Sequence, residues 1–348
     1  MLTRNVNSER AENIAKLPNV SLIQGSQDSQ EDLHRALNGV WGAWVNTDGF
    51  TIGEKNELFY GIRAYEIARH ERVQHYVYAS ADYALKDANW NQKYHWGHND
   101  AKARVADFIL AQGQKGMTSS ILVTGPYMDM LYDGMFVPQK HTDGSFVWAN
   151  PAGKHIFSFP GKSLTRFPRV VDGKIPLIAL EDIGAYSLWM FDNIKDSAGL
   201  ELKIATDEVS FAEIATTFTE VTGKPAAHQF VPLEVYLPLA EPFPYAAANW
   251  AAGPKAPRDE STMTWRENFG AWWLYWGEGL SEKRDWALLD KIHPQRIKSL
   301  KEWMEKNNYD GQPKSVLKGV EDLRKWAQAE AQAQAKLDIE GSQGLGRL

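Results

Sequence analysis

Residues 73–80, V-Q-H-Y-V-Y-A-S, decide the fold. β-Branched and aromatic residues fill this stretch, which predicts a buried strand of a parallel sheet ending at Ser80. Residues 98–102, H-N-D-A-K, then lead into a helical pattern over residues 101–112. We therefore expect a strand that brings the Ser80 hydroxyl to the carboxyl edge of a sheet, followed by a helix that carries Lys102.

Strand and helix patterns alternate on both sides of this stretch, and such alternation predicts βαβ units and a parallel sheet. The sequence thus predicts an α/β domain over residues 1–150. The expected strands are residues 1–5, 20–24, 40–46, 73–80 and 118–124, and the expected helices are residues 8–17, 30–38, 54–69 and 101–112.

The pattern changes in the second half of the chain. Short strands with many glycines and prolines are expected over residues 143–174, and longer strand and helix units return over residues 175–206. Residues 210–221 predict a helix with a serine cap before it and a glycine stop after it. Residues 225–254 are rich in proline and alanine, which predicts an irregular lid or connector. The chain is expected to end in a flexible tail over residues 331–348.

Aromatic residues recur at helical spacing late in the chain, and 14 of the 348 residues are tryptophan. A buried helix face explains this spacing better than a ligand-binding face, although both remain open. The residues concerned are Trp265, Phe269, Trp272 and Trp276.

The composition excludes several kinds of chemistry. The chain has no cysteine, which rules out a disulfide framework, a thiolate metal site and a thiol nucleophile. His95, His98 and Asp100 lack a further ligand at fixed spacing, so no metal site is expected from them.

The charge and hydropathy pattern restrict the partners and the location. The formal net charge of −6 argues against direct binding to a phosphate backbone, because nucleic-acid surfaces carry a basic excess. No apolar run reaches the ~20 residues that span a bilayer, and the first residues lack a signal-peptide core. We expect a protein of the cytoplasm or nucleus that contacts neither nucleic acid nor membrane.

Five short features along the first hundred residues resemble, in order and spacing, the NmrA-like family. Its members are atypical relatives of the short-chain dehydrogenases, and they include fungal nitrogen-repression regulators, redox sensors and cluster-encoded oxidoreductases. The resemblance covers about residues 1–235. The features are Arg4, Gln24-Gly25, Asn46-Thr47, Tyr78-Ala79-Ser80 and His98-x-x-x-Lys102.

The resemblance implies a Rossmann-like parallel sheet in the NAD(P)-binding domain, residues 1–150, with return strands over residues 175–206. A smaller, mostly helical domain that contacts the substrate or a partner follows over residues 151–330. The family begins with a strand and a Gly-x-x-Gly-x-x-Gly turn that holds a dinucleotide pyrophosphate, and this sequence has neither. In the strand order 3-2-1-4-5-6 that strand is central, so we expect an N-terminally truncated sheet unless another segment fills the position. A further hypothesis is that the truncated chain cannot hold a cofactor.

The resemblance also implies NADP as the cofactor. Arg4 corresponds to the arginine that family members place against the 2′-phosphate, with a solvated arginine as the alternative. Relatives carry their adenine contacts after the strand expected here over residues 20–24, and their ribose contacts after the strand expected over residues 40–46. A plain turn would explain the residues after this last strand equally well. The other implied cofactor ligands are Gln24, Gln27 and Asp28 near the adenine, Asn46 and Thr47 beside the pyrophosphate and ribose, and Lys102 at the nicotinamide ribose.

The Tyr-x-x-x-Lys motif of ordinary short-chain dehydrogenases is replaced by His98-x-x-x-Lys102, and residues four apart share one helical face. An imidazole has an unperturbed pKa near ~6.5 and can donate a proton, although a capping or supporting histidine is the preferred interpretation. Tyr94, one further turn upstream, is the alternative acid. Ser80 either polarises the substrate or is a satisfied hydroxyl at the end of its strand.

Two hypotheses of function follow from the resemblance. The preferred one is an NADP(H)-dependent oxidoreductase acting on a bulky aromatic or polyketide-like carbonyl in secondary metabolism, with Trp272 and Trp276 lining the pocket for this small molecule. The alternative is a non-catalytic, NADP-sensing negative regulator of the nitrogen-metabolite-repression type, which would act by contact with a transcription factor. The replaced tyrosine favours the regulator, whereas the aromatic C-terminal half resembles the cluster-encoded enzymes.

Overall fold

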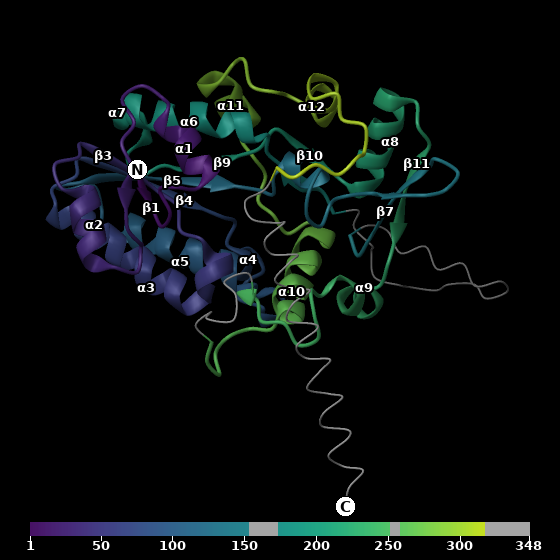
Figure 1. Ribbon diagram of the computed structural model, residues 1–348, viewed down its shortest axis with the longest axis horizontal. Helices are drawn as coiled ribbons and strands as arrows, with labels where there is room; N and C mark the ends of the chain where they lie inside the picture. The colour runs from purple at the N-terminus through teal and green to yellow at the C-terminus, as the bar shows by residue number, and fades with distance from the viewer. Residues whose placement is uncertain (153–172, 251–257, 317–348) are drawn as a thin grey trace, which may run out of the picture.

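The computed structural model describes residues 1–152, 173–250 and 258–316, and the tail expected over residues 331–348 lies outside these ranges. Figure 1 shows a parallel sheet with helices on both faces, and a second group of helices and short strands beside it. No helix in the described ranges combines the length and the apolar character of a membrane span.

The main sheet is parallel and four-stranded, in the order β3-β4-β5-β9. All six residues of β4 are buried, as its run of β-branched and aromatic side chains predicts. Ser80 ends β4 and pairs in register with Val123 of β5. The prediction of an α/β fold organised around this strand is confirmed. The strands are β3 (Gly42–Val45), β4 (His75–Ser80), β5 (Thr118–Thr124) and β9 (Glu201–Ile204).

Helices cover both faces of the main sheet (Figure 1). Tyr76 and Tyr78 point into the core on one face and Val77 into the core on the other, which is the alternation of a pleated strand. α3 and α5 approach closely at Gly61, where a Cβ atom would lie 2.8 Å from Val105 Cγ2. One face carries α2 (Gln30–Leu37), α3 (Gly49–His70) and α5 (Gly97–Ala111), and the other carries α6 (Leu180–Asp192), α7 (Ile194–Ser197) and α11 (Trp286–Ile292).

The first two strands form a separate parallel pair, β1 (Leu2–Thr3) and β2 (Ile23–Gln24), connected by α1 (Glu9–Ala15). In the part of the chain that the structure describes, no strand joins this pair to the main sheet. The pair is held by α2, whose buried Leu33 and Leu37 share a core with α3. The described sheet is therefore interrupted at the position where the sequence predicts a missing central strand.

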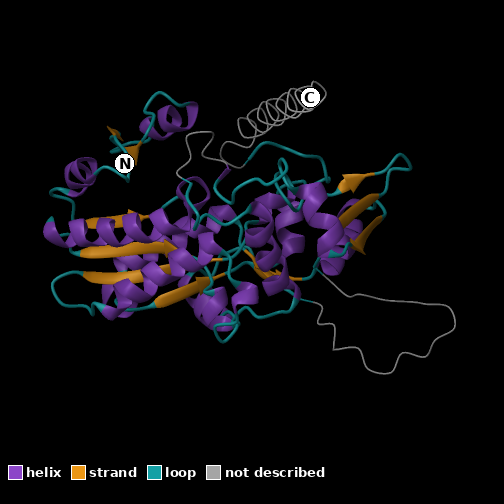
Figure 2. Ribbon diagram, turned by 90° about the horizontal axis from the view of Figure 1, so that it is seen from below, coloured by secondary structure: helices purple, strands orange, loops and turns teal. Residues whose placement is uncertain are grey.

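A second unit with its own core contains a three-stranded sheet, β11-β7-β6, and an antiparallel pair, β10-β8. Figure 2 shows its three-stranded sheet at the end of the molecule away from the main sheet. Its strands are β6 (Gln139–Lys140), β7 (Phe146–Asn150), β8 (Ile175–Leu177), β10 (Asp207–Val209) and β11 (Ala226–Phe230). Its helices are α8 (Phe211–Thr222), α9 (Leu233–Ala240), α10 (Trp265–Gly277) and α12 (Leu300–Lys306). The connections contain α4 (Ala84–Asp87) and two 3₁₀ turns, η1 (Gln92–Tyr94) and η2 (Met128–Leu131).

One expectation for this region is wrong, and the strands of another divide between two sheets. The irregular segment expected over residues 225–254 instead contains β11, which pairs parallel with β7, and the helix α9. The sequence of β11, A-A-H-Q-F, has weak β-propensity, so its tertiary pairing decides its structure. Of the return strands expected over residues 175–206, β9 joins the main sheet, whereas β8 pairs antiparallel with β10.

The helix expected over residues 210–221 is confirmed as α8. Ser210 and Glu213 form a reciprocal capping box at its start, and Gly223 ends it in the left-handed region with φ 71°.

Candidate active site

A cavity of about 210 Å³ opens at the carboxyl ends of β3, β4 and β5. This edge is where open α/β sheets bind their ligands. Asn46, Ser80, His98 and Lys102 contribute polar groups to the cavity, but most of its lining is aromatic or aliphatic. We call it the aromatic cleft. Its larger apolar side chains are Trp44, Phe50, Trp96, Met130, Met135, Phe269, Trp272 and Trp276.

Lys102 extends from α5 to the side of the aromatic cleft formed by the end of β3. Its ammonium donates to the carbonyl oxygen of Thr47 (2.5 Å) and to Asn46 Oδ1 (3.1 Å). The same nitrogen lies 2.8 Å from Glu57 Oε1. The structure therefore brings together three predicted cofactor ligands, Asn46, Thr47 and Lys102, and it fixes the lysine by several oxygen atoms.

Glu57 lies beneath this cluster with no exposed surface. The Thr47 hydroxyl donates to Glu57 Oε1, and the Tyr78 hydroxyl lies 3.4 Å from Thr47 Oγ1. Burial, reinforced by the Glu57 charge, raises the pKa of Tyr78 well above its usual value. Since a buried carboxylate is costly without a counter-charge, Lys102 and Glu57 depend on each other.

His98 occupies the first turn of α5 and is 8% exposed. Its Nδ1 lies 2.8 Å from the Nδ2 atom and 3.0 Å from the Oδ1 atom of Asn268, and its ring lies 4.3 Å from that of Phe50. Burial lowers the pKa of His98 to about 4. The imidazole is therefore neutral at pH 7, where it can donate a hydrogen bond but holds no spare proton.

We expect this burial to make the fold less stable in mild acid. The folded pKa of about 4 lies below the usual 6.5, so the unfolded chain takes up the proton first. Stability is thus lost as the pH falls from about 6.5 to 4, by roughly 3 kcal/mol for this group. Denaturant unfolding of the wild type and of His98→Gln at pH 7 and pH 4 measures the difference.

Burial raises the pKa values of Asp87 and Asp100 to about 6. These two carboxyl groups therefore take up protons first in the folded state, and they stabilise it as the pH falls. The wild type and His98→Gln share these carboxyl groups, so the difference between their losses of stability is due to His98. Equal losses of stability in the wild type and in His98→Gln would contradict a neutral, buried imidazole.

Tyr94 and Ser80, the other predicted catalytic groups, lie in different places. Tyr94 belongs to η1, and α5 begins only at Gly97, so Tyr94 is not one turn upstream on the same helix. Its hydroxyl donates to Glu278 Oε2 (2.5 Å), and its side chain is absent from the lining of the aromatic cleft. Ser80 does line the cleft, with its hydroxyl 3.4 Å from the Ala81 carbonyl oxygen.

The predicted ligands at the ends of β1 and β2 do not line the aromatic cleft. Arg4 extends toward the carboxyl end of β3, where its Nη2 lies 3.9 Å from Asp48 Oδ2. The backbone carbonyls of Gln24 and Gln27 accept hydrogen bonds from arginines of α2 and α3, and Asp28 is exposed. A single ligand that met both groups of residues would have to extend across the interruption in the sheet.

The aromatic helix is both a core element and a wall of the cleft. α10 begins at a capping box formed by Thr264 and Glu267. Trp272 and Trp276 are 5% and 1% exposed, and both line the aromatic cleft together with Phe269. The buried face that the spacing predicts is confirmed, and contact between these tryptophans and a substrate stays a prediction.

His95, His98 and Asp100 do not share a ligand position. His95 Nε2 pairs with Glu54 Oε1 at 2.9 Å, whereas the Asp100 carboxylate accepts two backbone N–H groups. His98 faces Asn268 instead.

Two residues of the site, Glu57 and Asn268, are not among those predicted from the sequence. A signal for Glu57 exists, because it shares the buried face of α3 with Gly61, Ala64 and Ala68, at spacings of a single helical face. Asn268 carries no comparable signal, since it meets His98 only through the packing of α10 against the start of α5.

A parallel sheet of βαβ units with a ligand-sized cavity at its carboxyl edge defines a Rossmann-like α/β protein. More narrowly, the chain belongs to the NmrA-like family, whose model matches residues 1–251.

Solved structures agree with this assignment at the level of the fold. The negative transcriptional regulator NmrA in complex with NADP shares 18% identity, with 88% of this chain and 89% of that chain covered and a TM-score of 0.62. Triphenylmethane reductase from Citrobacter sp., complexed with NADP(H), shares 17% identity, with 88% of each chain covered and a TM-score of 0.58. An NADPH-dependent quinone oxidoreductase from Escherichia coli, complexed with NADPH, shares 15% identity, with 88% of this chain and 89% of that chain covered and a TM-score of 0.58.

Proposed function

We propose that this protein is an NADP(H)-dependent oxidoreductase that reduces a bulky aromatic or polyketide-like carbonyl compound in the cytoplasm or nucleus. The observation that carries the proposal is the aromatic cleft, whose lining includes Trp272, Trp276 and the fixed Lys102 at the carboxyl edge of the sheet. Flat apolar walls suit an aromatic substrate. Two reductases with the same fold also support the assignment.

Reduction of a carbonyl needs a hydride, which reduced NADP supplies when bound, and a proton. In this chain, neutral His98 would donate a hydrogen bond to the carbonyl oxygen, as neutral imidazoles do elsewhere. Its Nδ1 accepts from the Asn268 amide in that arrangement, which leaves the other ring nitrogen as the donor. Ser80 would add a second hydrogen bond, and the proton would come from water entering the cleft.

The residues present fit the adenosine 2′-phosphate and the nicotinamide ribose of NADP, but not the pyrophosphate between them. Arg4 suits the 2′-phosphate, with Gln24, Gln27 and Asp28 beside the adenine. The cluster around Lys102 suits the nicotinamide ribose. The sequence contains no three glycines spaced as Gly-x-x-Gly-x-x-Gly, so it offers no such cradle for the pyrophosphate.

A second function is favoured by the state of the candidate acids. His98 is neutral at pH 7, and the Tyr94 hydroxyl is engaged by Glu278 outside the cleft. A cleft whose histidine is neutral, and which Tyr94 does not reach, suits a non-catalytic NADP sensor that represses a transcription factor by protein contact, and the regulator NmrA shares the fold.

Titration of the purified chain with NADP(H) and NAD(H), followed by tryptophan fluorescence, tests both functions. A charge-assisted contact from Arg4 to the 2′-phosphate is expected to favour NADP by about ten- to a hundredfold. Arg4→Ala should abolish the preference, whereas Arg10→Ala, an exposed arginine of α1, should preserve it.

Turnover then separates the two functions. Oxidation of NADPH that depends on a quinone or aromatic ketone supports the oxidoreductase. NADP binding without turnover on such compounds supports the sensor. Absence of any dinucleotide binding contradicts both proposals.

A further inference from the structure

Two histidines and a glutamate meet on the main-sheet unit, outside the aromatic cleft. His34 lies in the last turn of α2, His70 ends α3, and Glu71 is the residue after it. Their ligand atoms all lie within 4.8 Å of one another. Across residues 1–152, 173–250 and 258–316, this is the one group of three or more histidine and carboxylate side chains that converges in this way.

We propose that His34, His70 and Glu71 form a binding site for a zinc ion. Imidazole nitrogen and carboxylate oxygen are ligands that zinc prefers in a chain without thiolates. Three protein ligands leave a fourth position for water, the arrangement of an open tetrahedral site.

Two of the three pairs of ligand atoms have spacings close to those of a filled site. Glu71 Oε1 lies 2.7 Å from His34 Nδ1 and 3.2 Å from His70 Nδ1. Ligand atoms bound to tetrahedral zinc at ~2.0–2.1 Å stand roughly 3.3 Å apart, so small side-chain rotations suffice. Without metal, these groups hold one another by hydrogen bonds, and zinc would replace those protons.

The surroundings support a cation at this position. Asn38 Nδ2 donates to Glu71 Oε2 at 2.7 Å, which orients the carboxylate as outer-shell groups do in metal sites. α2 and α3 both end here, and the negative ends of their dipoles favour positive charge. The His70 side chain is 74% exposed, which gives an ion access from solvent.

Zinc at this position would join α2 to α3. The packing of these two helices holds the β1–β2 pair against the main-sheet unit, and Arg4 directly follows β1. The proposed ion therefore acts as a clamp on the N-terminal segment, independently of any reaction in the aromatic cleft.

Isothermal titration of the untagged, chelator-treated chain with zinc chloride tests the site, with magnesium chloride as the control ion. We expect one zinc per chain, and at a hundred times the dissociation constant a roughly hundredfold increase in the ratio of folded to unfolded chain. His70→Ala, at an exposed position, and Glu71→Gln are each expected to weaken zinc binding at least tenfold. His141→Ala removes an exposed histidine of the β6–β7 turn and should bind zinc like the wild type.

Limited proteolysis provides a second measurement, in which zinc should slow cleavage before residue 40 in the wild type and not in His70→Ala. No saturable binding up to millimolar zinc would overturn the proposal. Equal binding by the wild type, His70→Ala and Glu71→Gln would overturn it as well.

Discussion

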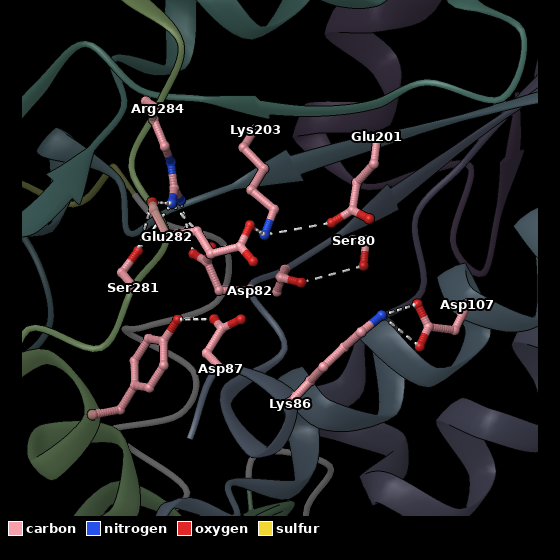
Figure 3. Close-up of polar contacts among 12 residues, drawn as sticks. Ser80, Asp82, Lys86, Asp87, Asp107, Glu201, Lys203, Ser281, Glu282 and Arg284 are labelled. Atoms are coloured by element: carbon pink, nitrogen blue, oxygen red, sulfur yellow. Dashed lines mark hydrogen bonds and ion pairs between the residues drawn. The ribbon is translucent and has the colours of Figure 1, made fainter. Parts of the chain in front are cut away.

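Replacing Arg284 with methionine is expected to cost the folded state about 3–5 kcal/mol, because the change leaves a buried carboxylate without its counter-charge. Figure 3 shows the pair: the two terminal nitrogens of Arg284 lie 3.0 and 2.8 Å from the two carboxylate oxygens of Asp82. Both side chains are 1% exposed. With total stabilities of about 5–15 kcal/mol, such a loss puts the whole fold at risk.

The pair joins the two halves of the candidate site. Asp82 follows Ser80 by two residues at the end of β4, whereas Arg284 lies in the loop between α10 and α11. The guanidinium also donates to Ser281 Oγ (2.9 Å) and to the Glu282 carbonyl oxygen (2.8 Å), so it holds this loop against the sheet. Loss of Arg284 is expected to loosen the loop that follows the aromatic helix.

Urea unfolding measures the effect, and two further variants control it. Lys86→Met removes an exposed partner of Asp107, a pair also visible in Figure 3, and should cost at most about 1 kcal/mol. The double variant Asp82→Leu with Arg284→Met removes both charges and should recover most of the loss. A cost below about 1 kcal/mol for Arg284→Met alone would mean that water reaches Asp82 in the folded state.

The sequence predicts the main sheet well because its strands are identified by local pattern. The central residues of β4, Tyr76 to Ala79, are apolar on both faces, and this is visible without knowledge of any partner. β11 is different: it owes its structure to pairing with β7, far earlier in the chain, and neither its composition nor its periodicity shows this.

The residues of the candidate site also divide into those that a local pattern predicts and those that only tertiary packing brings together. His98 and Lys102 could be predicted because a spacing of four places them on one face of α5. The same spacing does not extend to Tyr94, because α5 begins only at Gly97 and Tyr94 lies in η1 before it. Asn268 could not be predicted, because it reaches His98 only through tertiary packing.

If the protein is an oxidoreductase, replacing Lys102 with methionine is expected to lower kcat/KM for hydride transfer by roughly a hundredfold or more. The same change removes the counter-charge of Glu57, which is fully buried, whereas Lys102 is 15% exposed. We therefore also expect a loss of about 3–5 kcal/mol in stability. An inactive Lys102→Met variant alone would not distinguish a lost ligand from a lost fold.

The double variant Glu57→Gln with Lys102→Met separates these effects. A neutral amide at position 57 no longer needs the ammonium, and it can still accept from the Thr47 hydroxyl, so the fold is expected to recover most of its stability. NADPH binding and turnover are then measured on a folded protein, with Glu57→Gln alone as the control that keeps the lysine. If the double variant turns over at the rate of that control, Lys102 has no part in the reaction, and its cluster with Asn46, Thr47 and Glu57 serves the fold. If turnover is lost while the double variant remains as stable as the control, Lys102 acts on the cofactor or the substrate, because the structural role has been removed from the comparison.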